Sequence, residues 1–180
     1  ANLAVYCGRG NGNRALVDTG KTHYWTRGWE NHMDTLCIKF TPKPPVKVVA
    51  GSIVAFRGGR HNRWCAQEHN NWRCNRGHIG QWEKYQVVNA GGGRYGLKSL
   101  RNNRYCADEN MHSRILCNRG HIGQWEKFQI VQAGSGKVAL RGGRNNRYCY
   151  DHGHAVRCDR NGYGHQREKW EMKCVGNCNG

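Results

Sequence analysis

The sequence predicts an all-β fold from three observations. First, the stretch at 101–128, RNNRYCADENMHSRILCNRGHIGQWEKF, has a close copy at 60–85 and another at 144–170. Second, the landmarks recur about every 42 residues, and a short apolar strand precedes each copy. Third, glycine is frequent (25) and proline scarce (3), while no apolar periodicity indicates a long helix. Three units of roughly four short strands are too few for a propeller and predict the twelve strands of a β-trefoil.

The first 45 residues do not match the repeat and are predicted to be an extension of strands and turns, packed on the trefoil or stapled to it. Aromatic residues such as Tyr24, Trp25 and Trp29 are rare in disordered tails. Proline at 42, 44 and 45 marks the boundary, because proline cannot continue the interior of a sheet. The trefoil is expected at 46–175, with repeats of about 46–89, 90–133 and 134–175 and a tail at 176–180.

Each repeat carries the motif R-x-N-R-[WY]-C. Asparagine tolerates a left-handed backbone and bonds its own main chain, so the motif is predicted to contain a turn. Equivalent apolar residues of the three units should meet around a pseudo-threefold axis. Three triplets are predicted to form this core: Phe56, Leu97 and Leu140; Tyr85, Phe128 and Trp170; Val87, Ile130 and Met172.

Six of the ten cysteines occupy matching positions, two in each repeat. Each pair brackets a predicted hairpin, and an insertion of two residues in the middle unit keeps every strand residue on its face. The pattern predicts three disulfides, each worth roughly 2 to 3 kcal/mol: Cys65–Cys74, Cys106–Cys117 and Cys149–Cys158. Disulfides persist in oxidising compartments, so the protein is predicted to be secreted. The alternatives are buried thiols in a cytosolic protein and a zinc site, which the lack of C-x-x-C spacing disfavours.

The other four cysteines lie in the terminal segments: Cys7, Cys37, Cys174 and Cys178. Three pairings within the chain are possible, and the sequence does not choose among them. The termini of a trefoil lie close together, so bridges from Cys7 or Cys37 to Cys174 or Cys178 would staple the extension to the barrel. Bridges between molecules are a fourth option.

The second half of the repeat carries a more specific motif, C-N-R-x-x-I-G-x-W-E-K-[FY], which ends at Trp82–Tyr85 and Trp125–Phe128. With the preceding apolar strand and the turn, this pattern resembles the fascin-type β-trefoil over about 130 residues. The resemblance implies the trefoil fold and, as one alternative function, actin binding or bundling. Bundling fascins resemble four trefoils in tandem, are cytosolic and lack a disulfide framework. This chain has a single trefoil and a cysteine in each R-x-N-R-[WY]-C motif. The third repeat also departs from the motif, with Arg167 where the tryptophans stand.

Charge indicates an anionic partner. Lys and Arg number 29 against 12 acids, a formal charge of +17, and most of the basic residues are arginine. Arginine presents a planar fork suited to carboxylate, sulfate and phosphate. The alternative is a solvated face, with some arginines stacked on aromatic rings. Nine repeated arginines are the predicted polyanion-binding residues: Arg60, Arg63, Arg76, Arg101, Arg104, Arg119, Arg144, Arg147 and Arg160.

A second alternative is a lectin of the β-trefoil type. Gln-Trp pairs at 81–82 and 124–125 are similar to the Q-x-W of ricin-type lectins, although one residue is missing. Such lectins use an early acidic residue in each unit. Asp108 and Asp151 are candidates, but the first repeat has Gln67 there.

No catalytic motif, cofactor site or metal-ligand spacing is recognised, so no enzymatic activity is expected. The repeated glutamate of W-E-K is interpreted as a structural partner of a neighbouring basic residue. We therefore predict a non-enzymatic extracellular scaffold that assembles with copies of itself and binds anionic material. The expected partner is an acidic glycan, an acidic protein or a mineral such as silica. Nucleic acid is disfavoured, and no apolar stretch approaches the roughly 20 residues that would insert into a membrane.

Overall fold

The computed structural model describes residues 4–9, 23–27, 34–40, 43–69, 71–110, 112 and 114–178. The chain divides into two compact units, residues 1–44 and 45–180. The first is an antiparallel sheet in the order β1-β3-β2. Its strands are β1 (Ala4–Arg9), β2 (His23–Arg27) and β3 (Asp34–Phe40). No helix among the described residues is long and apolar enough to cross a membrane.

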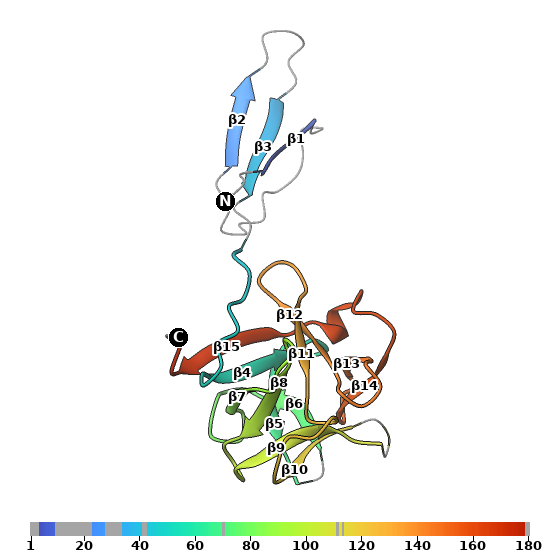
Figure 1. Cartoon of the computed structure of the whole chain (residues 1–180). Coiled ribbons are helices and arrows are strands. Elements are labelled where there is room, and N and C mark those ends of the chain that lie inside the picture. The colour runs from blue at the N-terminus through green and yellow to red at the C-terminus, as the bar shows by residue number, and fades with distance from the viewer. Residues whose placement is uncertain are drawn as a thin grey trace. The chain divides into compact units, whose positions relative to one another are not determined.

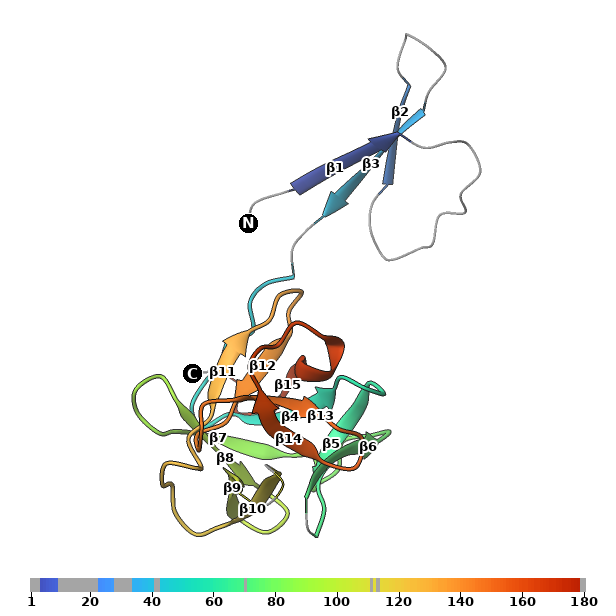
Figure 2. The same ribbon diagram turned by 90° about the vertical axis from the view of Figure 1, so that its right-hand side faces the viewer.

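The second unit is a β-trefoil, as the sequence predicts, with four strands from each repeat (Figures 1 and 2). Repeat 1 contains β4 (Ile53–Gly58), β5 (Arg63–Gln67), β6 (Trp72–Arg76) and β7 (Tyr85–Asn89). Repeat 2 contains β8 (Tyr95–Ser99), β9 (Arg104–Asp108), β10 (Ile115–Arg119) and β11 (Gln129–Gln132). Repeat 3 contains β12 (Val138–Arg141), β13 (Tyr148–Asp151), β14 (Val156–Arg160), the 3-10 turn η2 (Gln166–Glu168) and β15 (Glu171–Gly176).

The first and last strands of each repeat close into a barrel. β4 pairs with both β7 and β15, β7 pairs with β8, and β11 pairs with β12. Two short bridges, Tyr95 with Phe128 and Val138 with Trp170, complete the ring. Each bridge has two backbone hydrogen bonds of 2.8 Å. The barrel therefore has no open edge at either bridge.

The middle strands of each repeat form three hairpins, β5–β6, β9–β10 and β13–β14, and the second strands β6, β10 and β14 contact one another. The three predicted disulfides within the repeats are confirmed, because each cysteine pair lies in register across its hairpin. The cysteines are buried, and the equivalent residues Trp72, Ile115 and Val156 are buried beside them. Each hairpin is thus tied covalently and packed on the core.

The predicted triplets lie in the core. Phe56, Leu97 and Leu140 are fully buried, as are the aromatic residues of the second triplet. In the third triplet Val87 is fully buried, Met172 nearly so, and Ile130 packs against the core while partly exposed. The asparagines of the R-x-N-R motifs also behave as predicted: the third residue of each has a positive φ, 52° at Asn62, 58° at Asn103 and 62° at Asn146.

Of the pairings that the sequence leaves open for the terminal cysteines, the structure excludes the staple between the two units. Cys174 is bonded to Cys178, four residues further along the chain. Neither is therefore available to bridge the two units. The register of β1 and β3 places Cys7 opposite Cys37. Packing of the first unit on the trefoil stays a prediction.

Candidate anion-binding grooves

The turn that precedes the second strand of each repeat places two arginines at a junction between repeats. We call these junctions 1–2, 2–3 and 3–1. At each, a buried residue at the end of a hairpin strand meets the first arginine of the following R-x-N-R motif. The pairs are Gln67 with Arg101, Asp108 with Arg144, and Asp151 with Arg60.

Groove 1 lies at junction 3–1 and has a volume of about 450 Å³. It is lined by Arg60, His61, Arg63, Arg73, Cys74 and Asn75 of repeat 1 and by Gly153 and His154 of repeat 3. Two contacts join its walls: Asn71 Nδ2 donates to the His154 carbonyl at 2.7 Å, and Arg60 Nη1 to the His152 carbonyl at 3.4 Å.

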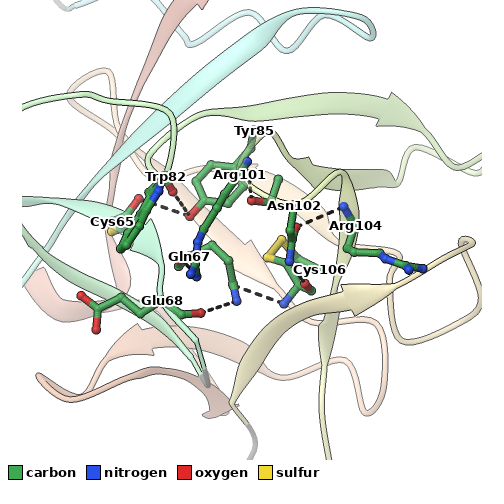
Figure 3. The surroundings of a disulfide bond; sticks show 11 residues. Cys65, Gln67, Glu68, Trp82, Tyr85, Arg101, Asn102, Arg104 and Cys106 are labelled. Carbon is green, nitrogen blue, oxygen red and sulfur yellow. Dashed lines mark hydrogen bonds between the residues drawn. A yellow bond between two sulfur atoms is a disulfide. The ribbon is translucent and has the colours of Figure 1, made fainter.

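Groove 2 lies at junction 1–2 and has a volume of about 960 Å³. It is lined by Gln67 and His69 of repeat 1 and by Arg101, Asn102, Arg104, Arg114, Leu116, Cys117 and Asn118 of repeat 2. Figure 3 shows its inner end, where Gln67 lies beside Arg101 and Asn102. The Cys117 N–H donates to Gln67 Oε1 at 3.3 Å, and Asn102 Nδ2 donates to the Cys117 carbonyl at 2.7 Å.

The two grooves are related by the internal repeat. Arg60, Arg63 and Asn75 of groove 1 occupy the same repeat positions as Arg101, Arg104 and Asn118 of groove 2. No carboxylate of a described residue lines either groove. Every ion pair between described residues involves residues outside the two grooves. The positive charge of the grooves is therefore not neutralised by ion pairs within the described part of the chain.

The nine predicted arginines fall into two sets. Four line the grooves: Arg60, Arg63, Arg101 and Arg104. The other five contact acidic or amide groups of the protein. Arg76 lies 3.1 Å from Glu68 and 3.9 Å from Glu83, and Arg119 lies 2.7 Å from Glu109 and 3.7 Å from Glu126. Arg144 pairs with Asp108, Arg160 with Asp159, and Arg147 donates to Asn161.

Two groove arginines escaped the sequence analysis, Arg73 and Arg114. They lie on or beside the second hairpin strand, outside the R-x-N-R motif, and are not equivalent to each other. The available signal was a basic residue one to three positions before the second cysteine of a pair, at Arg73 and Arg114. Arg73 Nε is buried and has no hydrogen-bond partner among the described residues.

The buried junction residues are not exposed sugar-binding groups. The exposed fraction is 3% for Gln67, 0% for Asp108 and 1% for Asp151, so the ricin-like role considered for Asp108 and Asp151 is not met. Asp151 accepts from the Gly153 N–H at 2.8 Å and the Arg60 N–H at 3.2 Å. Burial raises the pKa of Asp108 to about 7, against the opposing effect of the Arg144 guanidinium.

Two of the repeated glutamates have the basic partner that we expected: Glu83 lies 3.9 Å from Arg76, and Glu126 lies 3.7 Å from Arg119. Glu83, Glu126 and Glu168 are buried, and they accept from the backbone N–H groups of Gly80, Gly123 and His165 at 2.6, 2.7 and 2.8 Å. These hydrogen bonds hold the loop before the last strand of each repeat. No group of three or more His, Cys, Asp or Glu side chains suited to a metal ion occurs in the described residues.

Comparison with known proteins supports the fold. No protein-family model matches the sequence, and no curated protein matches it. Among solved structures, the designed threefold-symmetric protein ThreeFoil has a TM-score of 0.62 at 14% identity, covering 68% of this chain and 99% of its own. A Macrolepiota procera ricin B-like lectin in complex with lactose has 0.60 at 12%, covering 71% and 99%. A Polyporus squamosus lectin bound to the epitope Neu5Acα2-6Galβ1-4GlcNAc has 0.62 at 12%, covering 72% and 51%. At such identities the likeness shows the β-trefoil fold alone.

Proposed function

We propose that the trefoil is a carbohydrate-binding domain that holds the sulfate or carboxylate groups of acidic glycans in grooves 1 and 2. One observation carries the proposal: six arginines line two equivalent grooves, and no carboxylate is among the described residues that line them. Clefts lined by one sign of charge focus the electrostatic field and raise the local concentration of counter-ions. The guanidinium fork matches a sulfate or carboxylate in two parallel hydrogen bonds.

Two further observations support a glycan over other anions. Trefoil neighbours include lectins in complex with lactose and with a trisaccharide that ends in Neu5Ac, an acidic sugar. The four disulfides of the trefoil unit are typical of oxidising compartments, which supports an extracellular protein. A site for neutral sugars built on Asp108 and Asp151 is disfavoured, because both are buried.

The prediction of an extracellular scaffold that assembles with copies of itself rests on this binding of anionic groups. An extracellular scaffold that assembles with copies of itself at a charge of +17 needs counter-anions between the molecules. Sedimentation with and without silicate or sulfated glycan tests that step. The fascin-like resemblance, the absence of actin bundling and the absence of enzymatic activity likewise stay predictions. Co-sedimentation with filamentous actin tests the second of these.

The test of the proposal is calorimetric titration of the full chain with a defined sulfated hexasaccharide at two salt concentrations. We expect Arg63→Gln combined with Arg104→Gln to weaken binding at least about 10-fold, the loss of one charge-assisted contact in each groove. The matched control removes two exposed lysines outside the grooves, Lys43→Gln with Lys173→Gln, and should change affinity less than about 2-fold. Equal losses in both double variants would mean that net charge alone binds the glycan. Neutral-sugar binding that survives high salt would favour the lectin alternative.

A further inference from the structure

Trp82 lies outside groove 2 but stacks on one of its arginines. The Arg101 guanidinium carbon is 4.2 Å from the centre of the indole ring, and Arg101 Nη1 donates to the Gln67 carbonyl at 3.0 Å (Figure 3). Trp82 and Gln67 belong to repeat 1, whereas Arg101 belongs to repeat 2. The guanidinium is therefore held at two points across the junction, and the side chain is half-buried.

Groove 1 has a different support for the equivalent arginine. The third repeat has Arg167 at the position of Trp82, so Arg60 lacks the equivalent of the indole that stacks on Arg101. Arg60 Nη1 donates to the His152 carbonyl at 3.4 Å, a longer bond than that of Arg101, and the residue is exposed. A flexible arginine loses rotamer freedom when it binds a ligand, whereas a stacked arginine has already lost it. The two grooves thus have similar charge but different preorganisation.

We propose that Trp82 is a positioning residue, which fixes the Arg101 guanidinium for an acidic group of the ligand and makes groove 2 the tighter of the two sites. This rests on the proposed binding of acidic glycans. Nη1 of Arg101 is engaged by Gln67, so the edge formed by Nε and Nη2 offers two parallel N–H groups. Sulfate and carboxylate oxygens both accept such a pair, and a cation on an indole face keeps its charge.

The test favours groove 2 in the full chain by carrying Arg63→Gln, which weakens groove 1 by one charge-assisted contact. Calorimetric titration with the sulfated hexasaccharide then compares three changes over a series of salt concentrations. Trp82→Leu should weaken binding about 10-fold, and Trp82→Phe, which keeps an aromatic face, should restore most of it. Trp82→Leu removes no charge, so the slope of log affinity against log salt should not change. Arg101→Gln should lower both the affinity and the slope, by about one, because one ionic contact is lost.

Trp125→Leu is the matched control. Trp125 is exposed to the same degree as Trp82, 36% against 39%, and the Arg119 guanidinium lies 5.8 Å from its ring, outside both grooves. It should leave the affinity within about 2-fold. Equal losses from Trp82→Leu and Trp125→Leu, a failure of Trp82→Phe to restore binding, or no loss from Trp82→Leu would each overturn the proposal. Arg104→Gln separates the two claims: if it weakens binding while Trp82→Leu does not, groove 2 stands and the role of Trp82 falls.

Discussion

Junctions 1–2 and 2–3 are built from equivalent residues that differ by one charge. At the first, the neutral Gln67 accepts through its backbone carbonyl from Arg101, which lines groove 2. At the second, the fully buried Asp108 lies 3.8 Å from Arg144 Nε, and Arg144 is 18% exposed. At these two junctions the arginine beside the neutral residue lines a groove, and the arginine beside the carboxylate pairs with it. Junction 3–1 adds a third case: Asp151 is a carboxylate, but it accepts from the Arg60 backbone N–H, and Arg60 lines groove 1.

The largest expected effect concerns the charge of Asp108. Burial raises its pKa to about 7 in the folded protein, above the ordinary value of 3.8. Between pH 4 and 7 the unfolded chain has lost this proton while the folded protein keeps it, so stability should fall as pH rises and level off above 7. The change is on the order of 4 kcal/mol for a shift of this size.

Asp108→Asn gives junction 2–3 the neutral character of junction 1–2 and should remove this slope. Urea denaturation from pH 4 to pH 8 measures it. Asp151→Asn is the control, since it leaves Asp108 in place and the slope should persist. An unchanged slope in Asp108→Asn would show that Asp108 ionises normally when folded.

A second change tests the space beside the two junctions. Ser99 is buried near junction 1–2, and the equivalent residue of repeat 3 is Gly142. A Cβ on Gly142 would overlap the Asp108 carboxylate, with Cγ 2.8 Å away. Gly142→Ser should therefore cost about 3 kcal/mol of unfolding free energy, whereas Ser99→Gly should cost about 1. Similar losses from both, measured by denaturation, would mean that the two junctions are equally packed.

The reverse exchange gives junction 1–2 the carboxylate of junction 2–3, and it should remove the advantage of junction 1–2 in glycan binding. Gln67→Asp places a carboxylate beside Arg101, which should draw the guanidinium inward and weaken the sulfated hexasaccharide at groove 2 about 10-fold, or about 1.4 kcal/mol. Gln67→Asn shortens the side chain without adding charge and serves as the control. Titration in the Arg63→Gln background measures both variants. Equal weakening by Gln67→Asp and Gln67→Asn would mean that the length of this side chain, rather than its charge, determines the affinity of groove 2.

The smallest effect is expected where an arginine already has carboxylate partners. Arg76→Gln removes a charge that lies 3.1 Å from Glu68, so glycan affinity should change less than about 2-fold. Arg104→Gln removes the same charge from groove 2 and is the matched comparison. A larger loss of glycan affinity from Arg76→Gln than from Arg104→Gln would mean that the ligand contacts the arginines paired with carboxylates rather than groove 2.

Much of the fold could be predicted from the repeat itself. Matching cysteines gave the three hairpin disulfides, and the asparagines of R-x-N-R gave the left-handed turns. The bond between Cys174 and Cys178 could not be predicted, because neither cysteine recurs in the other repeats and nothing local distinguishes the possible partners.

The site was only partly predictable because equivalence in sequence does not fix which arginines meet acids. Arg76 and Arg104 both recur in the repeats. The Glu68 carboxylate nevertheless pairs with Arg76, whereas Arg104 has no ion pair in the described part of the chain. Arg73 recurs only as Arg157, with Leu116 at that position in repeat 2, and Arg114 has no arginine at its equivalent positions, so neither belongs to a motif shared by all three repeats. The grooves become visible only when strands of neighbouring repeats are brought together.

The most direct measurement follows the arginine Nε–H resonances of the full chain by NMR while the sulfated hexasaccharide is added. We expect saturable shifts at Arg63, Arg73, Arg104 and Arg114, with Arg76 and Arg119 nearly unchanged because carboxylates already hold them. Shifts that spread uniformly over all arginines, or that are largest at Arg76 and Arg119, would contradict the two grooves as the binding sites.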